Sequence, residues 1–270
     1  MKVRRLGELE VGAVGMGSAQ TFDVVDDAGM IVRKKIMDQC VIEGVTFIDT
    51  SPMYGRAEWV LGNVMSGIRE KFQIATKVWC SGADTARRQI ARSFELLKTD
   101  HIELIQIHNL VDWRTHLPYL ENLKSEGKID LIGATYGYPD KLAELIELMN
   151  TGRLDTIQIS YNVKDRAVET KVLPLAEERN IGVIVMRPTG KGGLVNELTR
   201  KPEIGPLSEF GIDTWGQALL AWLISDSRIG VPIPATTKQE RITENAVPGN
   251  LEPLPKELRL YIEEETDRCI

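Results

Sequence analysis

Three apolar runs in the sequence end on residues that can carry out acid–base chemistry. The runs end on Asp49, Lys77 and His108, and the phenol of Tyr54 follows five residues after the first. Burying an unpaired carboxylate is costly, so Asp49 needs a basic partner. Strands commonly end on polar residues because they reach solvent, but three parallel neighbours ending in this way would gather the groups at one sheet edge. The pattern predicts a proton-transfer site.

These residue types suit the reduction of a carbonyl group. A free phenol has a pKa of about 10 and is a poor acid at neutral pH, but an adjacent ammonium stabilises phenolate and lowers that pKa. Lys77 would act on Tyr54 in this way, and Asp49 would hold Lys77 in place and keep it charged. His108 would orient the carbonyl oxygen or relay a proton to it. No side chain supplies a hydride, so a nicotinamide cofactor is predicted.

Alternating strands and helices must position these residues. Apolar spacing predicts helices over 26–43, 57–65, 85–98, 117–125, 141–150, 168–179 and 214–225. Apolar runs predict strands over 13–17, 45–49, 72–77, 102–108, 129–135, 156–161, 182–187 and 229–233. A hairpin around Gly7 and Glu8 precedes them, and a long loop over 188–212 follows the seventh strand.

This order predicts an α/β fold, a (β/α)8 TIM barrel with an N-terminal β-hairpin and extra loop and helix segments at the C-terminus. No shift in composition marks a linker, so residues 1–270 are expected to form a single domain. Barrel enzymes place their active sites at the carboxyl ends of the strands. The polar strand ends therefore point to function.

Composition narrows the class of protein. A net charge of −6 argues against non-specific nucleic-acid binding. Cys40, Cys80 and Cys269 lie far apart without a CxxC pair, which predicts neither a disulfide framework nor a metal site and favours a reducing cytoplasm. The start lacks the apolar core of a signal peptide, and no segment approaches the roughly 18 apolar residues of a membrane span. We expect a cytoplasmic protein, and a monomer is favoured because no apolar repeat demands assembly.

The chain resembles an aldo-keto reductase from end to end. The resemblance is carried by GVTFIDTSPMYGRAEWVLG, IATKVW, SFELLKTDHIELIQIH and PIPATTKQERITEN. The spacing of the four acid–base residues is similar to that of the family's catalytic tetrad. The resemblance implies that Tyr54 is the general acid, that Lys77 and Asp49 tune it, and that His108 helps to orient the carbonyl.

The resemblance also implies NADPH (NADP+) as cofactor. Gln158 matches the family's contact to the nicotinamide carboxamide, whereas Asn162 in the same stretch could simply cap a turn. The family's Ser–Asn pair is Thr135–Tyr136 here, and Met186 stands where an aromatic ring usually stacks on the nicotinamide. A thioether contacts a ring face but does not reproduce aromatic stacking.

The adenosine end of the cofactor is expected to meet a second set of residues. Arg241 and Asn245 match the family's contacts to the 2′-phosphate and adenine, and arginine pairs bidentately with phosphate. A phosphate position that is often lysine in relatives is Ala235 here, with Thr236 and Lys238 close by. The full set of expected cofactor residues is Gly17, Ser18, Thr135, Tyr136, Gln158, Met186, Arg187, Thr189, Lys191, Thr236, Lys238, Arg241 and Asn245. Within this set, Arg187 and Lys191 would meet the pyrophosphate.

A small carbonyl compound is the expected partner. Trp79 matches the family's pocket tryptophan, and Met53 and Phe22 are expected to line the same mouth. His101 and His116 lie away from strand ends, so surface positions are expected for both.

Two alternatives to carbonyl reduction stay open from the sequence. One is a non-catalytic or regulatory nicotinamide-binding module, which the altered contacts at Tyr136 and Met186 would suit. The other is a lyase or isomerase that uses the same acid–base residues without net hydride transfer. Net consumption of NADPH with aldehydes, ketones and quinones would separate both from a reductase.

Overall fold

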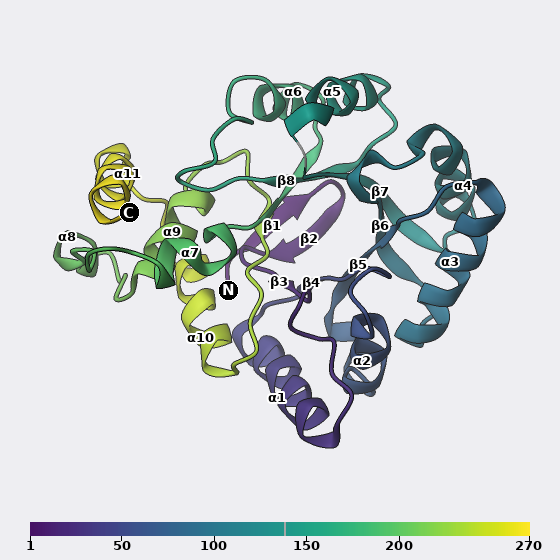
Figure 1. Ribbon diagram of the computed structural model, residues 1–270, viewed down its shortest axis with the longest axis horizontal. Coiled ribbons are helices and arrows are strands. Elements are labelled where there is room, and N and C mark those ends of the chain that lie inside the picture. The colour runs from purple at the N-terminus through teal and green to yellow at the C-terminus, as the bar shows by residue number, and fades with distance from the viewer. Residues whose placement is uncertain (138) are drawn as a thin grey trace.

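Parallel strands close into a barrel in the order in which they occur along the chain (Figure 1). The computed structural model describes residues 1–137 and 139–270. The strands are β1 (Val3–Leu6), β2 (Leu9–Gly12), β3 (Met16–Gly17), β4 (Phe47–Asp49), β5 (Gln73–Val78), β6 (Ile102–Ile107), β7 (Ile129–Tyr136), β8 (Thr156–Ser160), β9 (Gly182–Met186) and β10 (Val231–Pro232). Strands β3 to β10 form one 8-stranded sheet, and a parallel bridge between Gly17 and Ala235 closes it. The predicted (β/α)8 barrel is confirmed.

Helices surround the barrel (Figure 1). They are α1 (Asp27–Glu43), α2 (Ala57–Val64), α3 (Ala83–Leu97), α4 (Trp113–Ser125), α5 (Leu142–Asn150), α6 (Val172–Glu178), α7 (Gly193–Asn196), α8 (Gly205–Ser208), α9 (Trp215–Ile224), α10 (Glu240–Ala246) and α11 (Lys256–Cys269). Short 3-10 turns are η1 (Arg69–Lys71), η2 (His108–Leu110), η3 (Pro139–Lys141), η4 (Gly190–Gly192) and η5 (Val247–Asn250). Helix α3 shows why the apolar spacing was informative, because Ala86, Ile90 and Leu97 are all buried on one face.

Three segments differ from the sequence-based expectation. Helix α4 begins at Trp113 rather than at 117, and the Thr115 hydroxyl donates to the Asp112 carboxylate at 2.7 Å in its first turn. Helix α6 begins at Val172 rather than at 168. The segment 188–212, expected as a loop, contains η4, α7 and α8. Local turns decide these boundaries, and apolar spacing does not encode them.

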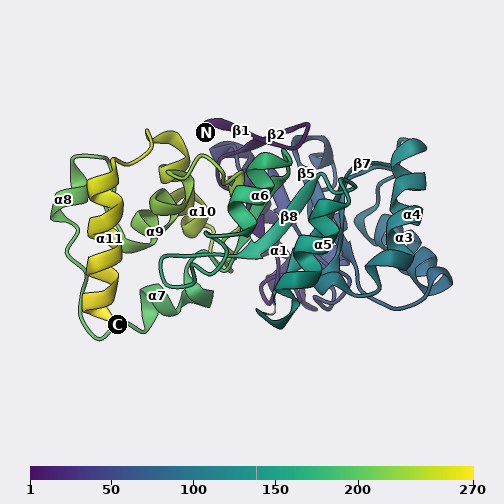
Figure 2. The same cartoon turned by 90° about the horizontal axis from the view of Figure 1, so that it is seen from above.

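The amino-terminal hairpin β1–β2 lies across the end of the barrel opposite α7 (Figure 2). Leu6 and Val11 of the hairpin pack against interior residues of the barrel strands, among them Phe47, Leu104 and Ile184. These side chains are almost fully buried. The hairpin therefore fills the amino end of the barrel with apolar side chains, and the carboxyl ends of the strands face the other way.

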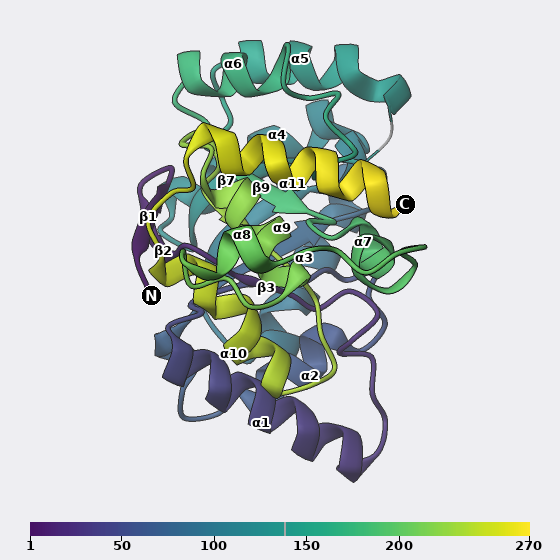
Figure 3. The same cartoon turned by 90° about the vertical axis from the view of Figure 1, so that its left-hand side faces the viewer.

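The carboxyl-terminal helix α11 packs against α9 on the flank of the molecule (Figure 3). The indole of Trp222 in α9 donates to the Glu263 carboxylate in α11 at 3.0 Å. Among the described residues, no helix is long and apolar enough to cross a membrane.

Candidate active site

Side-chain alternation brings three polar residues into the barrel interior near the carboxyl ends of the strands. Phe47 and Ala75 belong to the apolar interior cluster, and Asp49 and Lys77 lie two residues further along the same strands. Residues two apart in a strand point to the same face. Gln106 of β6 stands opposite Lys77 in the parallel register. The polar layer thus lies directly on top of the apolar one.

The Lys77 ammonium and the Asp49 carboxylate form a buried ion pair. Lys77 Nζ donates to Asp49 Oδ1 and Oδ2 at 2.8 and 2.7 Å and to the backbone oxygen of Thr50 at 2.7 Å. Gln106 Nε2 donates to Asp49 Oδ1 at 3.0 Å. Burial is the largest single influence and opposes the charged ammonium, but the charges of Asp49 and Tyr54 and the hydrogen bonds to them together outweigh it, so the pKa of Lys77 lies above its usual value. Lys77 therefore carries its charge at neutral pH.

Tyr54 lies over this ammonium. The turn that carries it is closed by a 3.0 Å hydrogen bond from its N–H to the Ser51 carbonyl. Lys77 Nζ lies 5.1 Å from the centroid of the phenol ring. Burial raises the pKa of Tyr54, the positive charge of Lys77 lowers it, and the negative charge of Asp49 raises it again. The influence of Lys77 has the expected sign, but the expected net lowering is wrong for this structure, because burial outweighs it. The phenol is protonated at neutral pH.

His108 completes the group as a neutral imidazole. Its Nδ1 lies 3.2 Å from the Ser51 hydroxyl, and its ring meets that of Tyr54 edge-on, with the centroids 6.1 Å apart. Burial, with the nearby charge of Lys77, lowers the pKa of His108 to about 3. The structure thus gathers all four residues of the predicted tetrad. Their chemistry consists of a protonated phenol, a fixed ammonium and an uncharged imidazole.

The three residues expected to line the substrate pocket differ in exposure. Trp79 and Met53 expose 43% and 41% of their surface, and the Trp79 ring centroid lies 6.4 Å from that of His108. Phe22 has no exposed surface and belongs to the core packed outside the barrel. Trp79 and Met53 therefore have exposed surface that can contact a substrate, whereas Phe22 has none and does not line the pocket.

Several of the residues expected at the nicotinamide end surround the same mouth. Gln158 is buried and opposes Thr135 in the sheet register, and its Nε2 has no hydrogen-bond partner among the described residues. Ser18 is also buried, with its backbone N–H bonded to the Asp49 carbonyl, and its hydroxyl has no partner in the part of the chain that the structure describes. Met186 ends β9 and packs on the interior cluster. The pair Thr135–Tyr136 ends β7, one strand away from β8. Unpaired buried donors at this position fit a polar ligand.

The residues expected near the pyrophosphate and adenosine lie outside this polar layer. Lys238 and Arg241 are exposed, just before α10 and in its first turn, respectively. Arg241 forms an ion pair with Glu244 of its own helix, and Glu244 also accepts from the Thr214 hydroxyl at 2.8 Å. Thr236 is buried and accepts from the N–H of Lys238 at 3.0 Å.

The remaining expected cofactor residues occupy three places. Gly17, in β3, donates its N–H to the Pro234 carbonyl at 3.2 Å. Asn245 is partly buried in α10. Arg187, Thr189 and Lys191 follow β9, and Arg187 and Lys191 are exposed with positive φ angles of 56° and 59°.

Sequence reasoning missed two polar residues of the site, and it also misplaced one histidine of helix α4. Gln106 was visible as a polar residue in an apolar strand, two before His108, and Ser51 as a hydroxyl two after Asp49. The surface position expected for His116 is wrong. It is 1% exposed, and its Nε2 lies 2.7 Å from the Cys80 carbonyl, because α4 begins early enough to include it.

Asn162 behaves as the turn cap that the sequence left open. Its Oδ1 accepts the N–H groups of Lys164 and Asp165 at 3.0 Å each. Its Nδ2 donates to the Arg187 carbonyl at 3.1 Å. The side chain therefore joins the loop after β8 to the end of β9.

A closed parallel barrel with an acid–base group at the carboxyl ends of its strands has the architecture of a barrel enzyme. Comparison with known proteins agrees with that class. The model of the Aldo/keto reductase family matches residues 13–264. The chain therefore belongs to the aldo/keto reductase family.

Individual relatives cover most of the chain. Methylglyoxal reductase YeaE of Escherichia coli (strain K12) is 29% identical over 249 residues, which are 89% of this chain and 86% of the relative. L-galactose dehydrogenase of Arabidopsis thaliana is 30% identical over 235 residues, 77% of this chain and 71% of the relative. The crystal structure of an aldo/keto reductase from Klebsiella pneumoniae in complex with NADP and acetate superposes with a TM-score of 0.84 at 26% identity, covering 97% of this chain and 94% of that one.

Proposed function

We propose that this protein reduces an aldehyde or ketone to an alcohol with NADPH, and that Tyr54 supplies the proton. As a member of its family, the protein is an NADP(H)-dependent oxidoreductase. The observation that carries the role of Tyr54 is the fully buried ammonium of Lys77, which is held by Asp49 and lies 5.1 Å from the centroid of the phenol ring. A fixed charge in a water-poor site acts far more strongly than it would in water.

The protein's own groups divide the work of proton transfer. Tyr54 is protonated in the ground state and donates from its hydroxyl to the carbonyl oxygen as negative charge develops there. The charge of Lys77 stabilises the phenolate that this donation leaves. Asp49 and the Thr50 carbonyl keep Lys77 from turning away, because they accept three short hydrogen bonds from its Nζ. The raised pKa of Tyr54 keeps the proton available until the oxygen becomes basic enough to take it.

His108 acts here as an orienting group. Its pKa of about 3 leaves the ring uncharged over the physiological range, so it offers one N–H donor and one acceptor. If the Ser51 hydroxyl donates to Nδ1, the proton lies on Nε2, which can then hydrogen-bond the substrate oxygen. A neutral donor fixes the carbonyl without competing with Tyr54 for the proton transfer.

The residues present fit a nicotinamide. The unpaired Gln158 Nε2 is a buried donor at the edge of the polar layer, suited to a carboxamide oxygen. Met186 offers a polarizable surface beside it for a ring face. When bound, the reduced cofactor supplies the hydride that no side chain can provide. Crystallised relatives that contain NADP and NADPH support this cofactor.

The substitution Tyr54→Phe tests the proposal. It should lower kcat by about a hundredfold to ten-thousandfold while leaving NADPH affinity nearly intact, because the phenol is needed for protonation and not for docking. Methylglyoxal is a reasonable first substrate, given the relative from Escherichia coli. NADPH oxidation and alcohol formation should be measured together.

A matched control makes the same chemical change elsewhere. Tyr119 lies in α4, with its ring under Arg87 and outside the polar layer. The Tyr119→Phe variant loses only a hydroxyl there and should reduce the carbonyl at the parent rate. A folded Tyr54→Phe protein with close to parent kcat would remove the acid role from Tyr54. Product that appears without NADPH oxidation would favour an isomerase or lyase instead.

A further inference from the structure

Arg187 is held in a backbone conformation that a non-glycine residue seldom adopts. It directly follows β9 and has a φ of 56°, in the left-handed region. Its carbonyl accepts two hydrogen bonds, from Asn162 Nδ2 at 3.1 Å and from the Gly190 N–H at 3.0 Å. Strained backbone of this kind persists where surrounding contacts determine it, and such residues cluster at functional sites.

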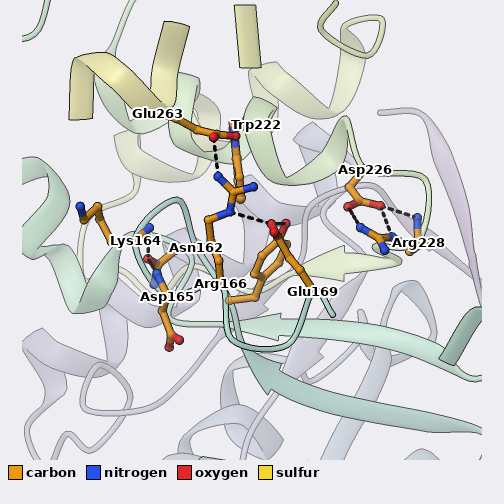
Figure 4. Close-up of polar contacts among 10 residues, drawn as sticks. Asn162, Lys164, Asp165, Arg166, Glu169, Trp222, Asp226, Arg228 and Glu263 are labelled. Atoms are coloured by element: carbon orange, nitrogen blue, oxygen red, sulfur yellow. Dashed lines mark hydrogen bonds and ion pairs between the residues drawn. The ribbon is translucent and has the colours of Figure 1, made fainter. Parts of the chain in front are cut away.

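The loop that carries Asn162 is itself anchored, as Figure 4 shows. Asn162 is 4% exposed, and its Oδ1 is fully used by two backbone N–H groups. Further along the loop, Arg166 reaches Glu169 at 2.9 Å and also pairs with Glu263 of α11. The carbonyl of Arg187 is therefore bound to a fixed part of the molecule.

The guanidinium of Arg187 lies over the mouth of the barrel. Its Nη2 is 4.0 Å from the point where a Cβ on Gly137 would stand, and Asn109 Oδ1 and Met186 Cε lie 3.1 and 3.4 Å from the same point. Gly137 follows β7, and Asn109 directly follows His108. The charge is also close enough to lower the pKa of the Tyr54 phenol in part. The side chain thus points towards the tetrad rather than along the segment 190–193.

Among the residues that the structure describes, this cation has no anionic partner of its own. Within the described part of the chain, the Arg187 guanidinium makes no hydrogen bond or ion pair, and the residue is exposed. Asp49, a carboxylate in the polar layer, is already neutralised by Lys77. An unpaired guanidinium that extends from an anchored backbone beside an acid–base site suits an anion carried by the ligand.

We propose that Arg187 binds a carboxylate on the substrate, so that the preferred substrates of this protein are oxo acids rather than neutral aldehydes or ketones. This inference rests on the proposed carbonyl reduction. A single planar guanidinium matches one carboxylate in a bidentate pair. The anion holds the substrate, and the carbonyl is left to Tyr54 and His108.

The test compares each oxo acid with its own ester. Glyoxylate and succinic semialdehyde are each assayed beside their methyl esters, with the parent, Arg187→Met and Arg187→Lys. The parent should prefer the acids, and Arg187→Met should lose roughly tenfold to a hundredfold in kcat/KM for the acids only, mostly through KM. Arg187→Lys should recover part of the loss. Arg200→Met removes the same charge from an exposed position near the end of α11 and should leave the acid-to-ester ratio unchanged.

A binding measurement separates this inference from the proposed reduction. Calorimetric titration of the NADPH complex with butanoate should show binding by the parent and at least tenfold weaker binding by Arg187→Met. If no carbonyl is reduced but this difference holds, carbonyl reduction fails and Arg187 is still an anion site. Equal losses for acid and ester, or parent enzyme that prefers the esters, would overturn the inference. The inference would also be overturned if Arg187→Met raised the NADPH Kd tenfold and left the ratio of acid to ester kcat/KM unchanged. That result would indicate that Arg187 binds the cofactor pyrophosphate.

Discussion

Replacing Lys77 by methionine should damage stability as well as catalysis. Methionine keeps most of the length and the apolar character of the side chain but leaves the Asp49 carboxylate, 3% exposed, with the neutral donor Gln106 as its one hydrogen-bond partner among the described side chains. Removing one partner of a buried ion pair costs about 3–5 kcal/mol, because the other charge stays buried without compensation. Against a typical total stability of about 5–15 kcal/mol, that loss is large. It should appear in urea unfolding as a lower midpoint with an unchanged slope.

A second substitution distinguishes the buried charge from lost packing. Adding Asp49→Asn to Lys77→Met removes the stranded charge while keeping an oxygen for Gln106 Nε2, so the double variant should regain about 2 kcal/mol over the single one. The comparison pair is Lys124 and Asp155, whose atoms lie equally close at 2.7 and 2.8 Å but whose side chains are 37% and 26% exposed. Lys124→Met should cost no more than about 1 kcal/mol.

Activity should follow a different order from stability. Both Lys77 variants should reduce an aldehyde far more slowly than the parent, because neither supplies the charge that stabilises the phenolate, whereas Lys124→Met should keep the parent rate. The reasoning is refuted if Lys77→Met unfolds within about 1 kcal/mol of the parent, or if adding Asp49→Asn destabilises it further. Either result would mean that the buried pair is not what the geometry indicates.

Two further predictions concern charge. Arg241→Ala should weaken NADPH binding by about tenfold to a hundredfold and NADH binding much less, because only NADPH carries the 2′-phosphate. Glu244→Gln should strengthen NADPH binding, because the phosphate would no longer have to displace the Glu244 carboxylate from Arg241. Equal weakening of both cofactors by Arg241→Ala would exclude phosphate recognition there. The pKa of His108 is about 3 in the folded protein and about 6.5 in the unfolded chain. As the pH drops, the unfolded chain therefore binds a proton before the folded protein does. The free energy of unfolding should fall between about pH 6.5 and 3, by up to about 1.4 kcal/mol per pH unit. Melting temperatures of His108→Gln should fall less steeply over that range, and parallel curves for variant and parent would contradict the assignment.

Three of the four tetrad residues could be placed together from the sequence because they lie at the ends of strands. Asp49, Lys77 and His108 each close or follow an apolar strand, and parallel neighbours put those ends together without any knowledge of side-chain packing. The net pKa of Tyr54 could not be predicted in the same way, because it depends on how completely the phenol is buried. The burial of His116 was missed for a related reason, since it depends on a helix start set by a local turn.

Contacts between distant loops were equally hidden. The sequence around Asn162 does not indicate that its side-chain amide donates to the Arg187 carbonyl, because that contact depends on the folded positions of both loops. Apolar periodicity describes which face of an element is buried, and it carries no information about which turn approaches which.

The hairpin across the amino end of the barrel has a consequence for the order of folding. Arg4 donates to the Ile229 carbonyl at 2.7 Å across 225 positions of the chain, and Leu6 packs against Gly182 at the start of β9 and Gly230 just before β10. The segment 1–12 thus completes its docking surface only when strands near the other end of the chain exist. Forming contacts between residues so far apart in the sequence is slow because of the entropy of loop closure. We therefore expect the hairpin β1–β2 to be among the last parts to pack in place during synthesis. Chains arrested before β10 should leave Leu6 and Val11 exposed, and a chaperone would meet them in that state.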